Sequence, residues 1–256
     1  MQSEFVKVAL DAAKNAEEII LSYYNGEINV ELKEDETPVT YADREAEKII
    51  RKTIKNSFPD HGFLGEEFGI EKGESSYIWI IDPIDATKNY IRKIPIFGTQ
   101  IALMKDDDII AGVSNAPLLN EVLYAEKGKG AYLNDHPINV SDISDLNDVM
   151  ICHGGIKWFV ERGTFPGIYN LINDTARSRG FGDFYMYHLV STARADAVIE
   201  AAISIWDIAA ITVIVREAGG TVTDLQGNDI TTETNSLLAT NGILHKKILN
   251  YFNENT

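Results

Sequence analysis

Residues 77–90 read YIWIIDPIDATKNY, an apolar run that ends in two acids separated by a proline and an isoleucine. The run has the length and composition of a buried strand. Pro83 fixes its own φ and biases Asp82 toward an extended conformation, so the turn that follows is stiff. Asp82 and Asp85 can then face the same space, where two close carboxylates are unfavourable unless a cation bridges them. Asp-Pro is also an ordinary strand-ending turn, and this stretch alone favours neither interpretation.

Further acids stand where other regular elements begin or end. Glu66 lies in FLGEEFG, within a Gly-rich acidic segment, 58–76, that we interpret as a loop. Asp207 directly precedes the apolar stretch IAAITVIV, a position typical of a helix N-cap. Thr40 and Asp43 resemble a capping pair at the start of a helix. Each acid has this ordinary structural interpretation, although oxygen ligands on rigid turns and helix starts also suit Mg²⁺.

The remaining patterns predict a layered α+β fold. Helical periodicity covers 5–24 and continues from Thr40, and short β-like runs from Tyr77 to about residue 134 favour an antiparallel meander. Strands then alternate with helices expected near 156–175, near 185–195, from Trp206 and from Ile243. We therefore expect an α+β N-terminal subdomain, 1–140, and an α/β C-terminal subdomain, 141–256, which share a core.

Composition limits the classes of function. The 256 residues carry a net charge of −16, which opposes nonspecific binding to nucleic acid. The single cysteine, Cys152, excludes an internal disulfide and fits a reducing compartment. Charged residues interrupt the first 25 positions, and no window of about 18 apolar residues predicts a membrane span. We expect a cytoplasmic protein without a nucleic-acid or membrane partner.

Four motifs taken together resemble a known family. GEEF, WIIDPIDATKNY and WDIAAITVIVREAGG are similar, in this order, to the three signature segments of the inositol monophosphatase family of Mg²⁺-dependent, lithium-sensitive phosphatases. PVTYADREAEK resembles that family's threonine-aspartate helix start, and the resemblance spans about residues 5–245. It implies a layered α/β/α/β/α sandwich of the inositol monophosphatase and fructose-1,6-bisphosphatase type. It also implies a homodimer, two or three Mg²⁺ ions and a small phosphorylated metabolite as substrate.

The resemblance assigns metal ligands residue by residue. It implies that Glu66, Asp82 and the carbonyl of Ile84 hold one Mg²⁺ ion. Asp82, Asp85 and Asp207 would hold a second ion, and Glu66 would reach a weaker third one. A two-metal site of this kind stabilises the attacking and the leaving oxygen of an in-line displacement.

The resemblance also assigns the catalytic and phosphate-binding groups. Asp43 and Thr87 would polarise the attacking water beside Glu66, and the backbone amides of Ala86 and Thr87 would cradle the phosphate. The family usually has glycine where this chain has Ala86. Glycine takes positive φ without strain, so alanine is harmless here if φ is negative and strained if φ is positive.

The substrate side of the site resembles one branch of the family. Lys88 after Thr87 looks more like the histidinol-phosphate phosphatases than the inositol phosphatases, and RGFGDFYMYHL contains that branch's Gly-Asp-x-Tyr-x-Tyr pattern. The resemblance places Asp183 near the leaving group and makes Glu200 a substrate contact. Acids there favour a cationic alcohol such as histidinol. The alternatives are inositol 1-phosphate, a sugar phosphate or nucleotide 3′-phosphate, or a catalytically weak regulator that binds metal or phosphate, for which Ala86 is the one favourable feature.

Overall fold

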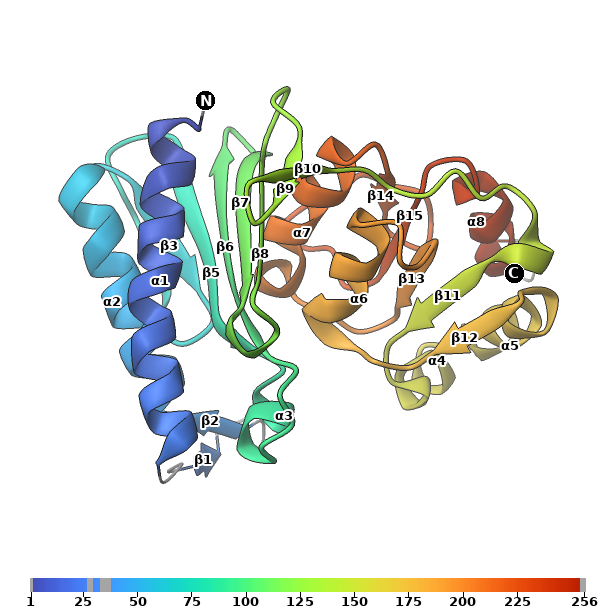
Figure 1. Cartoon of the computed structure of the whole chain (residues 1–256), viewed down its shortest axis with the longest axis horizontal. Helices are drawn as coiled ribbons and strands as arrows, with labels where there is room; N and C mark the ends of the chain where they lie inside the picture. Colours follow the sequence, from blue (N-terminus) through green and yellow to red (C-terminus); the bar gives the residue numbers. More distant parts are fainter. Residues whose placement is uncertain (1, 27–29, 33–37, 254–256) are drawn as a thin grey trace.

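Helices and sheets alternate in five layers in this computed structural model, which describes residues 2–26, 30–32 and 38–253. The larger sheet has eight strands and the smaller one five. Figure 1 shows helices outside the larger sheet, between the two sheets and outside the smaller sheet. Separate hydrophobic clusters fill the spaces between the layers. The predicted α/β/α/β/α layering is therefore confirmed.

The first layer consists of α1 (Glu4–Asn25) and α2 (Tyr41–Ser57), which pack on one face of the larger sheet. Both helices were predicted from their apolar periodicity, and both are confirmed. The buried side of α1 is rich in alanine, and small side chains at helical spacing let the helix lie close to its neighbours. The buried side of α2 instead includes charged residues, which bear on the site described below.

The larger sheet has the strand order β10-β9-β8-β7-β6-β5-β3-β4. All of its neighbouring pairs are antiparallel except β3 and β5. The predicted meander over β5 to β9 is confirmed. The strands are β3 (Gly62–Gly65), β4 (Gly69–Glu71), β5 (Tyr77–Asp85), β6 (Gly98–Lys105), β7 (Asp108–Ala116), β8 (Glu121–Glu126), β9 (Ala131–Leu133) and β10 (His136–Ile138).

The prediction that 58–76 is a loop is wrong for two short parts, β3 and β4. β3 pairs with β5 in parallel, from Gly62 opposite Ile78 to Gly65 opposite Ile81. A four-residue run flanked by glycines carries little local strand signal, and its pairing partner lies more than ten residues away along the chain. The consequence for function is direct, because β3 brings its carboxyl end beside the end of β5.

The middle layer consists of α6 (Asp183–Ser191) and α7 (Ile205–Glu217), which lie between the two sheets (Figure 1). A helix as apolar as α7 must be covered on all sides, and the two sheets cover it. Because α7 begins at Ile205, the interpretation of Asp207 as its N-cap is wrong. Ser204 is the N-cap, and Asp207 is the third helical residue.

The smaller sheet has the order β12-β11-β13-β15-β14, and α4, α5 and α8 cover its outer face. Its strands are β11 (Met150–His153), β12 (Arg177–Arg179), β13 (Ala197–Glu200), β14 (Thr221–Thr223) and β15 (Leu237–Thr240). The single helix predicted near 156–175 is two helices, α4 (Ile156–Glu161) and α5 (Phe165–Asp174). Gly163 breaks the helix with a φ of 73°, and Pro166 lies in the first turn of α5.

The remaining elements of the described chain are β1 (Val30–Leu32), β2 (Pro38–Thr40), α3 (Thr87–Ile91), α8 (His245–Asn253) and the 3-10 helices η1 (Pro117–Leu119) and η2 (Leu146–Asp148). The larger sheet ends at Ile138 and the smaller one begins at Met150. The division into subdomains near residue 140 stays a proposal, because α7 from the second half packs on strands of the first half. None of the helices within the described ranges is long and apolar enough to cross a membrane.

Candidate active site

The Asp-Pro-Ile-Asp turn lies at the carboxyl end of β5, and both of its carboxylates are buried. The register between β5 and β6 shifts between Asp82 and Asp85, so the strand bulges at the proline. The backbone N–H of Ile84 donates a 3.0 Å hydrogen bond to Asp82 Oδ1. Thr99 Oγ1 donates one of 2.8 Å to the carbonyl of Pro83. These bonds stiffen the turn in the way that its proline predicts.

Ala86, directly after the turn, takes the left-handed conformation with φ 70° and ψ 44°. This region costs an L-residue about 1–2 kcal/mol, whereas glycine adopts it freely. The position therefore has glycine geometry, and the case in which alanine is harmless does not hold. Ala86 is the N-cap of α3, and its carbonyl accepts hydrogen bonds from Asn89 and Tyr90. The next residue, Thr87, donates from Oγ1 to the carbonyl of Ile84 at 3.0 Å.

Glu66 follows β3 immediately, and its backbone N–H donates a 3.0 Å hydrogen bond to the carbonyl of Ile81 in β5. The Glu66 side chain is hydrogen-bonded to Asp82. The pKa of Asp82 is raised well above its usual range, first by burial and then by the charge of Glu66. Asp85 and Asp207 raise the same pKa further. Strands β3 and β5 thus bring together acids from two separate sequence motifs.

Asp43 forms the predicted capping pair with Thr40, which is confirmed. Asp43 Oδ2 accepts hydrogen bonds from the backbone N–H and from Oγ1 of Thr40, at 2.7 and 2.5 Å. The other oxygen, Oδ1, is buried without a hydrogen-bond partner among the described residues. Burial raises the pKa of Asp43 to about 7, against the lowering effect of the bonds from Thr40, and Glu67 and Glu66 raise it further. The cap occupies one oxygen and leaves the other available to a ligand or water.

Asp207 projects from the first turn of α7 toward the same group of acids. Its Oδ2 accepts a 2.7 Å hydrogen bond from the backbone N–H of Ser204, which closes a capping box. Its charge raises the pKa values of Asp82 and Asp85. Asp207 therefore takes part in the cap of α7 and also lies beside the other acids of the site, as Asp43 takes part in the cap of α2 and lies near Glu66.

The predicted substrate residues, Asp183 and Glu200, lie close enough to Asp85 to raise its pKa. Burial raises the pKa of Asp85 well above its usual range, and the charge of Asp183 is the next cause. The backbone N–H of Phe184 donates a 3.0 Å hydrogen bond to Asp85 Oδ2, which ties the start of α6 to the turn. Asp183 itself has a φ of 58°. Burial raises the pKa of Asp183 to about 6, and the charge of Lys88 lowers it.

Glu200 ends β13 and faces the same space. Burial raises the pKa of Glu200 to about 8, opposed by a hydrogen bond from Tyr187. Tyr187 donates from its hydroxyl to Glu200 Oε2 at 2.7 Å. A Cβ atom at Gly154 would lie 2.7 Å from Glu200 Oε1, so glycine at that position leaves room for the carboxylate. Asp183 and Glu200 raise the pKa of Asp85 together, so these acids form one electrostatic cluster with the turn.

The chemistry of the donor set fits a hard cation. Across residues 2–26, 30–32 and 38–253, no three histidine, cysteine, aspartate or glutamate side chains stand in a ready metal-binding arrangement. However, Asp82 and Asp85 are buried among further acids. Glu66, Asp85 and Asp207 raise the pKa of Asp82, and Asp183, Asp207 and Glu200 raise the pKa of Asp85. Carboxylate and carbonyl oxygens are the ligands that Mg²⁺ prefers, and a cation would favour the ionised form of every acid in the cluster.

Sequence reasoning missed Glu47 and Arg51 of α2, as well as Tyr187. Asp43, Glu47 and Arg51 follow one another at intervals of four and are all buried, on a helix whose apolar stripe also faces inward. Charged residues within an apolar stripe are a signal that sequence inspection can detect. Tyr187 belongs to the Gly-Asp-x-Tyr-x-Tyr pattern but had no assigned role.

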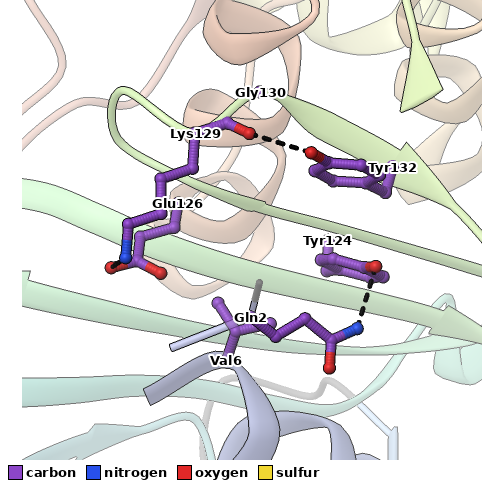
Figure 2. Close-up of a pocket in the computed structure, with 7 residues that line it drawn as sticks. All are labelled: Gln2, Val6, Tyr124, Glu126, Lys129, Gly130 and Tyr132. Atoms are coloured by element: carbon purple, nitrogen blue, oxygen red, sulfur yellow. Dashed lines mark hydrogen bonds and ion pairs between the residues drawn. The ribbon is translucent and has the colours of Figure 1, made fainter. Parts of the chain in front are cut away.

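A hollow of about 280 Å³ lies elsewhere, between the start of α1 and the β8–β9 hairpin. Figure 2 shows the aromatic pair that forms one wall, Tyr124 and Tyr132, whose ring centroids are 5.2 Å apart. Gln2 donates to the Tyr124 hydroxyl at 2.9 Å, and Tyr132 donates to the carbonyl of Lys129 at 3.2 Å. None of the predicted site residues lines this hollow. The acidic cluster around the Asp82–Asp85 turn is therefore the candidate active site.

Comparison with known proteins gives consistent results. The model of the Inositol monophosphatase family matches residues 1–256. A histidinol-phosphatase of Mycobacterium tuberculosis is 34% identical over 259 residues, which cover 99% of each chain. A fructose-1,6-bisphosphatase/inositol-1-monophosphatase of Thermotoga maritima is 37% identical and covers 84% of this chain and 82% of its own. The crystal structure of the extragenic suppressor protein suhB from Bartonella henselae superposes with a TM-score of 0.93 at 33% identity, covering 99% of this chain and 100% of its own.

Proposed function

The chain belongs to the inositol monophosphatase family and is a phosphoric monoester hydrolase, and from this premise we propose that it uses Mg²⁺ to hydrolyse histidinol phosphate. The observation that carries the proposal is the meeting of two acid groups at Asp85. The metal-side acids adjoin it through Asp82 and Asp207, and the substrate-side acids adjoin it through Asp183 and Glu200. A phosphate ester with a cationic alcohol is complementary to such an arrangement.

On the metal side, we propose the ligand sets that the family resemblance implies. Glu66, Asp82 and the Ile84 carbonyl would hold one ion, and Asp82, Asp85 and Asp207 a second, with a weaker third at Glu66. The Ile84 carbonyl already accepts from Thr87 Oγ1, and its second lone pair remains for a cation. Bound Mg²⁺ would lower the pKa of a water and offset charge on the phosphate and leaving oxygens.

The protein's own groups would orient the water and the phosphate. Thr87 Oγ1 donates its proton to the Ile84 carbonyl, so its lone pairs face outward as acceptors for a water O–H. Asp43 Oδ1, which has no hydrogen-bond partner within the described part of the chain, supports a similar accepting role. The backbone N–H groups of Ala86 and Thr87 stand at the amino end of α3, where they would donate to phosphate oxygens.

On the substrate side, the charges favour an amine over a polyol. Histidinol carries an amine and an imidazole, whereas inositol carries neither. Asp183 and Glu200 would accept hydrogen bonds from these cationic groups and regain their ionised forms in doing so. Tyr187 holds the Glu200 carboxylate in a fixed orientation. The histidinol-phosphatase of M. tuberculosis, similar over almost the whole chain, supports the same substrate.

Inositol 1-phosphate is the second candidate substrate. The fructose-1,6-bisphosphatase/inositol-1-monophosphatase of T. maritima is similarly related to this chain and supports it. A sugar phosphate or a nucleotide 3′-phosphate is a broader alternative within the same chemistry. The different-class alternative, a catalytically weak regulator, is favoured by one observation, the strained left-handed conformation of Ala86.

The test is phosphate release from a substrate panel in the presence of Mg²⁺. The panel contains histidinol phosphate, inositol 1-phosphate, fructose 1,6-bisphosphate and adenosine 3′,5′-bisphosphate. We expect the highest kcat/KM for histidinol phosphate, and Asp183→Asn is expected to lower it more than the value for inositol 1-phosphate. A rate on inositol phosphate far above that on histidinol phosphate overturns the substrate assignment. Activity that survives EDTA overturns the metal-dependent mechanism.

The state of assembly and the location also belong to the proposal. We propose a cytoplasmic homodimer, as the family resemblance and the single cysteine imply. Size-exclusion chromatography with light scattering would give a mass near twice 28.5 kDa. A mass of one chain at micromolar concentration would contradict the dimer.

A further inference from the structure

Glu47 and Arg51 of α2 form an ion pair inside the protein. Arg51 donates to Glu47 Oε1 from Nε at 2.8 Å and lies 2.7 Å from the same oxygen through Nη2. The side chains are 0% and 9% exposed, so the pair is removed from water. Burial raises the pKa of Glu47, and bonds from the Glu67 backbone and from Arg51 oppose that rise. A pair this deeply buried requires hydrogen bonds to all of its charged atoms.

Those further bonds go to the turn between β3 and β4, residues 66–68, and to β4, where Arg51 Nη1 donates to Glu71 Oε2 at 3.2 Å. The backbone N–H of Glu67 donates to Glu47 Oε2 at 2.8 Å, and the N–H of Phe68 also bonds to this carboxylate. Arg51 Nη2 donates to the carbonyl of Gly69 at 2.8 Å. The pair therefore holds the backbone from the centre of the 66–68 turn to the start of β4, at Glu67, Phe68 and Gly69.

Gly65 makes this close approach possible. A Cβ atom at position 65 would lie 1.9 Å from Glu47 Oε1 and 2.8 Å from Arg51 Nη2, so no larger residue fits beside the pair. The guanidinium also lies over the rings of Phe63 and Phe68, 5.3 and 5.8 Å from their centroids. Residues on either side of the 66–68 turn thus pack against the ion pair, so the turn and the pair fix each other's position.

The turn carries Glu66, and α2 carries Asp43 one helical turn before Glu47. Glu66 is fixed at one end by its backbone bond to β5 and at the other by the bond of its neighbour Glu67 to Glu47. The helix is rigid, so the pair sets the separation between Asp43 at its start and Glu66 on the turn. No side chain of the pair is itself among the predicted ligands or catalytic groups.

We propose that Glu47 and Arg51 are positioning residues, which set the affinity of the acidic site for Mg²⁺ by fixing the backbone of the 66–68 turn. The inference rests on the proposed function, in which Glu66 is a metal ligand. Partners that orient a metal ligand contribute about 10–100-fold to metal affinity. A purely structural role is a weaker explanation, because a buried ion pair is often no more stabilising than apolar residues of similar volume.

The test uses the double variant Glu47→Leu/Arg51→Met, which removes the hydrogen bonds from the ion pair to the turn and fills the same space with apolar side chains. Removing one partner alone would leave a buried charge, and the variant could then fail to fold for that reason. We expect the melting temperature of the Mg²⁺-free double variant to stay close to wild type. We expect the Mg²⁺ dissociation constant, measured by titration calorimetry, to rise about 10–100-fold. Amide hydrogen exchange over residues 63–69 should become faster at the same time.

Lys55→Met is the matched control. Lys55 lies one turn further along α2 and pairs with Glu71 of β4 at 2.6 Å. Glu71 also accepts from Arg51 at 3.2 Å, but the Lys55 and Glu71 side chains are exposed and neither bonds to the 66–68 turn, so this variant changes the outer contact of the pair and leaves its bonds to the turn in place. This variant should keep wild-type Mg²⁺ affinity and exchange. Unchanged Mg²⁺ affinity in the double variant would overturn the inference. Equal losses in the double variant and in Lys55→Met would do the same.

Glu66→Gln separates failure of this inference from failure of the proposed function. If Glu66→Gln weakens Mg²⁺ binding while the double variant does not, the positioning role is wrong and the metal site stands. If Glu66→Gln leaves Mg²⁺ binding unchanged, the metal role of Glu66 is wrong, and the positioning inference falls with it.

Discussion

Two polar clusters lie beneath the middle helices, and they differ in how their charges are balanced. One is the acidic cluster around Asp82. The other joins Ser114, His188, Glu121 and Arg194. Asp82 of β5 stands opposite Gln100 of β6, which stands opposite Ser114 of β7, so all three side chains leave the same face of the larger sheet. The clusters are only two strands apart.

The second cluster balances its own charges. His188 bonds through Nε2 to Ser114 Oγ at 2.7 Å and through Nδ1 to Glu121 Oε2 at 3.1 Å, and Arg194 binds both oxygens of Glu121 at 2.6 and 2.9 Å. Burial raises the pKa of Glu121, but the bonds from His188 and Arg194 outweigh it and lower the pKa to about 2. In the acidic cluster, burial and neighbouring acids raise the pKa of Asp82 together. In the second cluster, protein groups balance the charge of Glu121. The acidic cluster lacks such a balance, so it is suited to a cation from solution.

The largest expected effect separates the two clusters. Asp82→Asn should lower kcat/KM at least tenfold, and about 10²–10³-fold if the residue bridges two ions worth several kcal/mol. The same change should raise the stability of the Mg²⁺-free protein, because it neutralises one of several mutually repelling acids. Phosphate-release assays and urea unfolding measure the two quantities.

Glu121→Gln is the matched change in the second cluster. It should cost roughly 1.5–3 kcal/mol of stability through lost charged hydrogen bonds, and it should leave turnover near wild type. If Asp82→Asn kept more than about a tenth of the Mg²⁺-dependent activity, the acidic cluster would not be the metal site that catalysis requires, and the two clusters would not differ in function.

Removal of Mg²⁺ should reveal the acidic cluster through pH. Asp43 and Glu200 have raised pKa values in the folded protein, about 7 and about 8, against 3.8 and 4.5 when unfolded. Between the unfolded and the folded pKa of each group, the folded state binds more protons than the unfolded state. The free energy of unfolding therefore falls as pH rises through this range, by about 1.4 kcal/mol per pH unit for each group. Melting temperature in EDTA should therefore drop from pH 5 to pH 8. Added Mg²⁺ should restore more stability at pH 8 than at pH 5, and a flat profile in EDTA would contradict this prediction.

A smaller effect is expected from Ser114→Ala. Burial lowers the pKa of His188 despite the opposing influence of Glu121, so the imidazole is neutral at pH 7, with its proton on Nδ1 toward Glu121 and Nε2 accepting from Ser114. The variant leaves Nε2 as a buried acceptor without its donor, which costs roughly 1–3 kcal/mol. Urea unfolding should show this loss, and kcat/KM should stay unchanged. A lower kcat/KM in Ser114→Ala would indicate that the two clusters are coupled, for example through Gln100, which lies between them.

The contrast also explains what the sequence predicts well and what it does not. Acids that follow a strong strand or begin a helix, such as Asp82 and Asp43, stand out because the surrounding periodicity is clear. β3 was missed because a four-residue strand depends on a partner elsewhere in the chain. The N-cap of α7 was placed three residues too late, at Asp207 instead of Ser204, because both are good capping residues and together form a capping box.

The second cluster could not be predicted, because its members come from β7, β8, α6 and the segment that follows α6. Ser114, His188 and Glu121 have no shared spacing along the chain, and only the packing of α6 on the larger sheet brings them together. The Glu47–Arg51 pair could more easily have been predicted, because its two residues are only four positions apart on one helix. Backbone dihedrals are a further limit. The sequence poses the question of φ at Ala86, but neighbouring elements decide its sign.

The smallest expected effect comes from replacing Ala86 with glycine. The left-handed conformation costs alanine about 1–2 kcal/mol, and glycine loses roughly 0.5–1 kcal/mol of chain entropy, so Ala86→Gly should gain at most about 1.5 kcal/mol of stability. Ala193 is the matched control, since it has a φ of 58° and lies beside Arg194 of the second cluster. Ala193→Gly should give a similar gain and no change in turnover. If the methyl group of Ala86 hinders the approach of the phosphate, Ala86→Gly alone should also raise kcat/KM. Equal turnover in the two variants would show that the family's glycine serves only backbone geometry in this chain, and that the weak-regulator alternative has lost its one supporting feature.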